Sequence, residues 1–323
     1  MANGETDGPE RPDARLAELR ARREAQRRRR TARRWRLLAA AVLALVVLGG
    51  IAALAVSDES SKRSAADQGD GSRRAAAADS RARSGQVPSG RVRNSTPQPD
   101  WRPHTGPVPI LEYHVLGSPP TDAPYPELYV SRPDFHRQMN WLDAHGYEAV
   151  TLEQVQAAWY DGGPLPPKPV VVSFDDGYRP QFTYALPELR RHGWAGVLNL
   201  KAEGSDLYDS NVRAMLAAGW ELASHTIDHA DLTTLDAAAL RREVTGSREM
   251  LRRRYGVPVA NFCYPAGQFD PAVVAAVEAA GYTGATTQIP GDADRQAPYE
   301  LARYEILGSS GVAGFAADLA GSS

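Results

Sequence analysis

Apolar and polar residues alternate in blocks along the chain from about Pro107 onward. Short runs such as VPILEYHVL and PVVVSF are rich in β-branched residues and predict buried strands. Segments with helical periodicity lie between them. In SRPDFHRQMNWLDAHGY we expect Ser131 as N-cap and Phe135, Met139 and Leu142 on one face. Strands that alternate with helices are typical of an α/β domain with a parallel sheet. Roughly seven or eight such units favour a barrel over a small open sheet.

The first 100 residues have a different pattern. Leu37–Val56 is a run of 20 residues without a charge, long enough to span a bilayer as a helix. Arginines dominate the residues before it, which predicts that the N-terminus stays in the cytoplasm. We therefore expect a basic cytoplasmic tail (1–36), a transmembrane signal anchor (37–56), a disordered extracytoplasmic linker (57–106) and a catalytic domain (107–323). Cleavage near AALAVS, followed by secretion, is the alternative.

Charge is divided unevenly along the chain. Residues 1–100 carry 20 basic and 12 acidic residues, whereas residues 101–323 carry 17 basic and 27 acidic ones. The acidic domain argues against nucleic-acid binding, and the adjoining apolar span already accounts for the basic tail. The single cysteine, Cys263, excludes an internal disulfide. We expect the catalytic domain to be a monomer.

Chemically reactive side chains follow several of the predicted strands. Asp175 and Asp176 end one strand, and His225 and His229 follow another in the segment SHTIDH. The carboxyl ends of the strands in a parallel α/β barrel open on one face, so these residues are expected to meet. Two histidines and a carboxylate are typical of a catalytic metal site that leaves positions open for water and substrate. For the histidine pair taken alone, an ordinary surface pair is the alternative.

Three motifs together resemble a known family. SFDDG, SHTIDH and CYPAG have the order and spacing of the polysaccharide deacetylase family, the NodB-homology domain, over roughly residues 107–310. The resemblance implies a distorted (β/α) barrel. It also implies removal of N-acetyl groups from chitin-like polymers, peptidoglycan or secreted polysaccharides with a divalent metal. Zinc is the expected metal, with cobalt, nickel or manganese as alternatives.

The resemblance also implies roles for individual residues. Asp175 would be the general base, and Asp176, His225 and His229 would ligate the metal. Thr226 follows the first histidine, where the family has a serine or threonine that stabilises the loop. These roles agree with the chemistry of amide hydrolysis, since a dication lowers the pKa of water and polarises a carbonyl, and a neighbouring carboxylate accepts the proton.

The third motif departs from the family. The arginine that braces the catalytic aspartate is replaced by Cys263, which we interpret as a small buried hydrophobic residue. Pro265 and Gly267 match the family, and Tyr264 is expected to support the substrate site beside them. The backbone N–H of Ala266 is expected to be an oxyanion-hole donor. The family's tryptophan-bearing fourth motif has no convincing match.

The late Leu-x-His motif that supplies the catalytic acid is also missing, because no histidine follows His229. However, PILEYHVLG resembles the opening strand of the subgroup that deacetylates poly-N-acetylglucosamine, in which this strand supplies the acid. His114 is therefore the expected acid, with a structural histidine as the alternative. Strand alternation puts Glu112 on the same side, where it could orient the imidazole.

These observations predict a metal-dependent polysaccharide N-deacetylase anchored in the cell membrane. Its substrate would be an extracytoplasmic polymer containing N-acetylglucosamine, either peptidoglycan or an exopolysaccharide. Two alternatives stay open. The substitution at Cys263 and the missing fourth motif suggest a carbohydrate-binding protein without activity on a deacetylase scaffold. The same site could also hydrolyse another acyl bond, such as an ester or a small amide.

Overall fold

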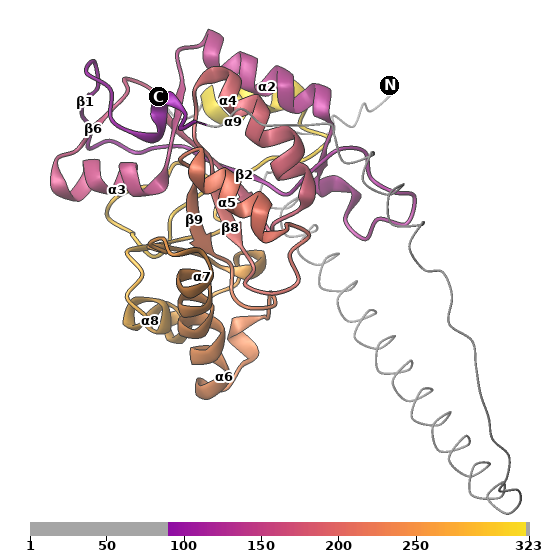
Figure 1. Cartoon of the computed structure of the whole chain (residues 1–323), viewed down its shortest axis with the longest axis vertical. Helices are drawn as coiled ribbons and strands as arrows, with labels where there is room; N and C mark the ends of the chain where they lie inside the picture. Colours follow the sequence, from indigo (N-terminus) through magenta and orange to yellow (C-terminus); the bar gives the residue numbers. More distant parts are fainter. Residues whose placement is uncertain (1–89, 321–323) are drawn as a thin grey trace, which may run out of the picture. The chain divides into compact units, whose positions relative to one another are not determined.

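A curled parallel sheet forms the centre of the computed structural model, which describes residues 90–320 (Figure 1). Seven of its eight strands form a continuous path, and β5 (Glu148–Val150) pairs with the first half of β7. All of these pairs are parallel. The order along the path is β11 (Gly284–Thr286), β10 (Asn261–Cys263), β9 (Glu221–Ser224), β8 (Val197–Leu200), β7 (Pro169–Asp175), β2 (Ile110–Tyr113) and β12 (Tyr304–Glu305).

The two edges of the sheet are joined by the chain that leads into β12. Leu301 donates a backbone hydrogen bond to Ala285 in β11, and Thr287 donates one back to Leu301, both at 2.9 Å. Two residues beyond Arg303, Glu305 in β12 pairs with β2 at the opposite edge. The sheet therefore curls round on itself, and residues 301–303 lie where its edges approach each other. The predicted α/β fold with a parallel sheet is confirmed.

Helices surround the sheet. Figure 1 shows α2, α4 and α9 grouped on one side and α6, α7 and α8 on another. The helices are α2 (Arg132–Ala144), α3 (Leu152–Asp161), α4 (Leu186–His192), α5 (Asp209–Ala217), α6 (Ala237–Arg241), α7 (Ser247–Tyr255), α8 (Pro271–Ala279) and α9 (Gly311–Ala320). Small peripheral pairs also form, β1 (Arg102–Pro103) with β6 (Pro164–Leu165) and β3 (Val115–Leu116) with β4 (Tyr129–Val130). Short 3₁₀ turns are η1 (Arg93–Ser95), η2 (Pro126–Leu128), η4 (Leu232–Thr234) and η6 (Pro265–Gly267).

Local sequence signals account for the helix starts. The Ser131 hydroxyl accepts a hydrogen bond from the backbone N–H of Asp134, as expected of an N-cap. Thr151 and Gln154 form a capping box at the start of α3. Two helical segments contain a wide π-turn, η3 (Gln181–Ala185) before α4 and η5 (Arg242–Gly246) between α6 and α7. Pro187 follows η3 and has no N–H to donate to the preceding turn, which favours the wider turn there.

The packed domain begins upstream of the predicted boundary at residue 107. Val92, Asn94 and Trp101 are buried. The Asn94 side chain donates to the Ala149 carbonyl at 3.2 Å, and its backbone N–H donates to the Gly193 carbonyl. Trp101 belongs to an apolar cluster with residues of β2, α3 and β7. The segment 90–106, which composition assigned to the linker, therefore covers part of the core.

The predicted basic tail, the predicted membrane span at 37–56 and the first part of the predicted linker lie outside the described residues. Between residues 90 and 320, no helix is long and apolar enough to cross a membrane.

The packing of Trp101 gives a stability prediction. Because this side chain is only 3% exposed, the substitution Trp101→Ala should lower the free energy of unfolding by about 3–5 kcal/mol, measured by chemical denaturation. Thr105→Ala, at an exposed position of the same segment, should change it by no more than about 0.5 kcal/mol. Equal stability of the two variants would show that residues 90–106 do not belong to the core.

Candidate active site

The two adjacent aspartates separate at the end of β7. Asp175 is the last residue of the strand and is buried, whereas Asp176 adopts a left-handed backbone with φ of 72°. Gly177 follows with φ of 75°, and a Cβ there would lie 2.4 Å from the Ser205 hydroxyl oxygen. Only glycine fits this combination of backbone and space. The turn directs the two carboxylates toward different partners.

Asp175 is held by a buried arginine. Arg303 donates to both carboxylate oxygens, from Nη1 to Oδ1 at 2.9 Å and from Nη2 to Oδ2 at 3.0 Å. The Asn199 side chain donates to Oδ1 at 2.6 Å. Burial alone would raise the pKa of Asp175, but the charge of Arg303 and the nearby histidines outweigh it and hold the pKa far below its usual range. Asp175 is therefore ionised at any physiological pH.

Arg303 comes from a part of the chain that the motifs do not include. Its side chain is only 1% exposed. Its Nε donates to the Thr287 carbonyl at 2.8 Å, and Nη2 lies 3.3 Å from the Cys263 sulfur. Nη2 also forms an ion pair with Glu112 at 3.1 Å. The brace expected at Cys263 is thus supplied by an arginine 40 residues later, which the sequence analysis missed.

Asp176 faces the two histidines. Its Oδ1 lies 3.9 Å from Nε2 of His225 and 3.7 Å from Nε2 of His229. These separations are too long for hydrogen bonds, but they suit three atoms that each lie about 2.0–2.2 Å from one ion. Nδ1 of His225 is bonded to the Cys263 carbonyl at 2.8 Å, which leaves Nε2 free to ligate. Burial lowers the pKa of His225, so the imidazole is neutral, as a ligand must be. The donor set fits a divalent metal.

Two other groups of residues have compatible spacing, Asp175–His225–Cys263 and Glu112–His114–Glu305. Arg303 donates hydrogen bonds to both carboxylate oxygens of Asp175 in the first and pairs with Glu112 at 3.1 Å in the second, so a guanidinium closely engages a carboxylate of each group. Burial also raises the pKa of the Cys263 thiol well above its usual value, which disfavours the thiolate that a metal needs. The group of Asp176, His225 and His229 is the best candidate among the described residues.

Several residues at this site have a left-handed backbone conformation, which is uncommon for residues other than glycine. Among residues 90–320, the non-glycine residues with positive φ are Asp176, Thr226, His229 and Ala266. The Thr226 hydroxyl accepts from the His229 backbone N–H at 2.9 Å, and the buried Glu243 accepts from Ile227. Such conformations cost free energy and persist where the surroundings enforce them. The loop that carries both histidines is therefore fixed by hydrogen bonds.

The third motif forms a tight turn at the end of β10. Ala266 has φ of 53° within η6, and Gly267 packs so closely that a Cβ would lie 2.6 Å from Gln288. Tyr264 precedes the turn, is buried, and donates through its hydroxyl to the Tyr299 carbonyl at 3.0 Å. Pro265 is the first residue of the turn and is buried. The turn is thus rigidly supported at the carboxyl edge of the sheet.

His114 lies next to the aspartates. The buried Gln181 donates through one nitrogen to the backbone carbonyls of both His114 and Asp175, at 2.9 and 2.6 Å. Nε2 of His114 lies 3.5 Å from the Glu112 carboxylate, while Nδ1 is buried without a hydrogen-bond partner among the described residues. Burial would lower the pKa of His114, but Glu112, Asp175 and Asp176 outweigh it and raise the pKa above 6.5.

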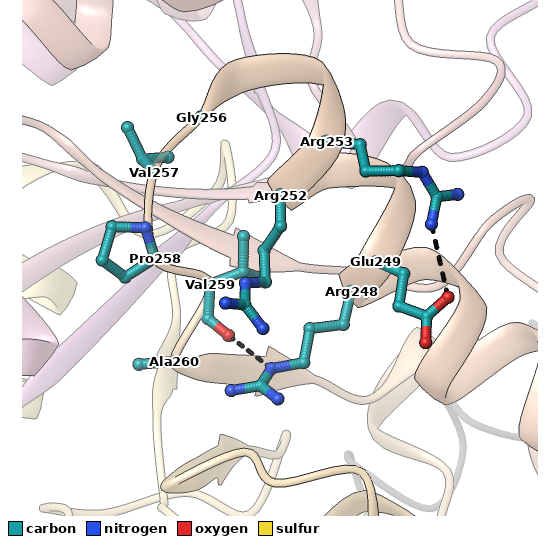
Figure 2. A pocket seen from close by; sticks show the side chains of 9 residues that line it. All are labelled: Arg248, Glu249, Arg252, Arg253, Gly256, Val257, Pro258, Val259 and Ala260. Carbon is teal, nitrogen blue, oxygen red and sulfur yellow. Dashed lines mark hydrogen bonds and ion pairs between the residues drawn. The ribbon is translucent and has the colours of Figure 1, made fainter.

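A groove in another part of the domain contains none of the reactive residues described above. It has a volume of about 620 Å³ and lies where α7 leads toward the amino end of β10 (Figure 2). Arg248 donates to the Val259 carbonyl, and Arg253 pairs with Glu249. The groove contains no histidine, cysteine or hydroxyl side chain. The reactive residues are instead at the carboxyl ends of β2, β7, β9 and β10.

Comparison with known proteins agrees with this site. Residues 162–285 match the sequence model of the family described as polysaccharide deacetylase. The chain carries a polysaccharide deacetylase domain. This match includes both aspartates, both histidines and the third motif. The family predicted from the motifs is confirmed.

Individual relatives of the deacetylase domain come from several bacteria. YxkH of Bacillus subtilis (strain 168), assigned to the polysaccharide deacetylases, is 28% identical over 214 residues, which is 65% of this chain and 74% of that protein. The poly-β-1,6-N-acetyl-D-glucosamine N-deacetylase of Escherichia coli (strain K12) is 35% identical over 95 residues, which is 29% of this chain and 14% of that enzyme. The crystal structure of BC0361, a polysaccharide deacetylase from Bacillus cereus, has a TM-score of 0.58 and 27% identity, covering 66% of this chain and 69% of that one.

The buried pair of Arg303 and Asp175 gives a prediction for the deacetylase domain. Arg303→Gln leaves Asp175 as a buried unpaired charge and should cost about 3–5 kcal/mol of stability. It should also lower deacetylation by at least about a hundredfold, because the carboxylate loses its orientation. Cys263→Ala should keep activity within about twofold, since a thiol with a raised pKa is a poor ligand and nucleophile. Chemical denaturation and acetate release measure the two effects. A large loss of activity in Cys263→Ala with none in Arg303→Gln would reverse this assignment.

Proposed function

We propose that this domain is a metal-dependent N-deacetylase that hydrolyses N-acetyl groups of an extracytoplasmic polysaccharide containing N-acetylglucosamine. Water and the amide yield acetate and a free amine on the sugar. One observation carries the proposal: Asp175 is fixed by Arg303, while the adjacent Asp176 faces His225 and His229. This division supplies an ionised carboxylate beside a three-ligand site, as metal-assisted hydrolysis requires.

Asp176, His225 and His229 would hold the metal in this proposal. Two neutral imidazoles and a carboxylate suit zinc, and also accept cobalt, nickel or manganese. When bound, the ion supplies polarisation of the substrate carbonyl and a lower pKa for the attacking water. Thr226 maintains the loop of the two histidines through its bond to His229.

Asp175 is proposed as the general base. Its ionised carboxylate accepts the proton from the attacking water. Arg303 and Asn199 fix its orientation through three hydrogen bonds, so the carboxylate needs no reorganisation during the reaction.

His114 is proposed as the general acid that protonates the leaving nitrogen. Its raised pKa keeps more of the imidazole protonated near neutral pH. Glu112 lies 3.5 Å from Nε2 of the imidazole. Glu112 would thus fix the orientation of the ring.

The turn of the third motif is proposed to bind the oxyanion. The backbone N–H of Ala266 would donate to the developing negative charge, a contact that does not depend on the side chain. Tyr264, Pro265 and Gly267 would hold this backbone in place, since all three pack tightly around the turn.

The relatives' names support a choice of substrates to test. The Escherichia coli relative is named for poly-β-1,6-N-acetyl-D-glucosamine, which favours an exopolysaccharide of this kind. Peptidoglycan is the second candidate because it also carries N-acetylglucosamine. Of the two grounds for a non-catalytic scaffold, the missing fourth motif and the lost arginine at Cys263, the second no longer favours it, because Arg303 donates to Asp175 in its place.

A location outside the cytoplasm is part of the proposal. The apolar run at 37–56, with arginines before it, supports a single-pass signal anchor with a cytoplasmic N-terminus. Residues 57–89 would then connect the membrane to the monomeric catalytic domain. Cleavage and secretion is the alternative, and the molecular weight of the protein in membrane and culture fractions distinguishes the two.

The first test of this proposal is acetate release by the zinc-loaded protein from poly-β-1,6-N-acetylglucosamine and from peptidoglycan. We expect turnover on at least one polymer, loss of activity with a chelator, and recovery on adding metal. Asp175→Asn should lower kcat by about 10²–10⁴-fold while metal still binds. Acetyl esters assayed in parallel reveal a different acyl preference. Glycan binding without acetate release in any metal form would contradict the proposal.

The pH profile provides a second test, directed at His114. An acid must be protonated, so kcat/KM should fall as the pH rises through the raised pKa of His114. Burial raises the pKa of Glu112 to about 7, so its negative charge is largest on the alkaline side of the profile. There the charge raises the pKa of His114, and Glu112→Gln should therefore move the alkaline limb to lower pH. His114→Ala should abolish that limb along with most of the activity. An alkaline limb that does not move in Glu112→Gln would argue against this pairing.

A further inference from the structure

Lys201 is a cationic side chain inside the candidate metal site. It directly follows β8, and its Nζ lies 3.5 Å from Oδ1 of Asp176. This is the same oxygen that His225 and His229 face. An ammonium group therefore lies among the atoms that would surround a divalent ion.

The position of Lys201 is fixed by its surroundings. The residues on either side bond to the histidine loop: His225 donates to the Leu200 carbonyl, and Ala202 donates to the Thr226 carbonyl, both at 3.0 Å. The Lys201 side chain is only 18% exposed, and Nζ lies 5.9 Å from the centre of the Tyr178 ring. Lys201 is thus not an ordinary surface lysine.

We propose that Lys201 is an internal cation of the metal site that weakens its affinity for divalent ions. Without metal, the ammonium compensates the charge of Asp176, whose side chain is only 12% exposed. A divalent ion must either displace this ammonium or bind against its repulsion, and both lower the affinity. The inference rests on the proposed metal site. It adds that Lys201 lowers the fraction of sites occupied at a given metal concentration.

An alternative role for Lys201 is recognition of an anionic group on the substrate. The geometry favours the metal site, because Nζ contacts a proposed ligand atom directly. The two roles differ in what they change: the first alters metal affinity in the absence of substrate, and the second alters KM alone.

The test is the dissociation constant for Zn²⁺ and Co²⁺, measured by competition with a chelating indicator in the absence of substrate. Lys201→Met should bind both ions about tenfold more tightly or more, because the repulsion between a monovalent and a divalent cation is removed. Lys201→Arg keeps the charge and should stay near the wild type. Lys168→Met is the matched control, since Lys168 precedes the amino end of β7, about 25 Å along the strand from Asp176, and should change neither constant.

The thermal shift on adding metal is a second readout. It should be larger for Lys201→Met, because the metal-free variant has lost the ammonium that pairs with Asp176. Unchanged or weaker metal affinity in Lys201→Met overturns the inference, whereas the proposed function survives if Asp176→Asn still abolishes binding. Absence of metal binding in both the wild type and Lys201→Met overturns both proposals.

Discussion

The buried ion pair between Arg303 and Asp175 is the interaction on which the site depends. Taking both charges out of water is costly, and the cost is offset only when the geometry is good and the remaining donors are satisfied. Here the guanidinium donates to both carboxylate oxygens and to the Thr287 carbonyl, and it forms an ion pair with Glu112. The pair therefore joins β7, β2 and the chain before β12 at one point. Because Arg303 engages Asp175, the neighbouring Asp176 is left to face the histidines.

The curled sheet makes this arrangement possible. The reactive residues come from positions as far apart as His114 and Tyr264, and parallel pairing places the carboxyl ends of their strands along one edge. The chain before β12 brings Arg303 to the same place. Gln181 then ties the ends of β2 and β7 together through two backbone carbonyls. The uncommon backbone conformations of Asp176, Thr226, His229 and Ala266 are concentrated at this edge. The free-energy cost of these strained backbone conformations is offset by the surrounding hydrogen bonds.

The sequence alone predicted the motifs and helix starts that depend on residues close together in the chain. The aspartate pair, the two histidines and the third motif lie within local motifs, and helix starts such as that at Ser131 follow from capping. The residues that it missed act through contacts distant in sequence. Arg303 bonds an aspartate 128 residues earlier, and Lys201, Asn199 and Glu243 reach the site only through strand order and the histidine loop. The arginine in LARYEIL belongs to no local motif, and its burial becomes evident only in the folded domain, where β12 pairs with β2.

The central claim is that the two aspartates have separate partners, and metal location tests it most directly. The measurement is a crystal structure of the zinc-loaded protein with anomalous diffraction at the zinc edge. We predict one strong peak about 2.0–2.2 Å from Asp176, His225 and His229, with Asp175 still bonded to Arg303. A peak between Asp175, His225 and Cys263, or between Glu112, His114 and Glu305, would contradict this account.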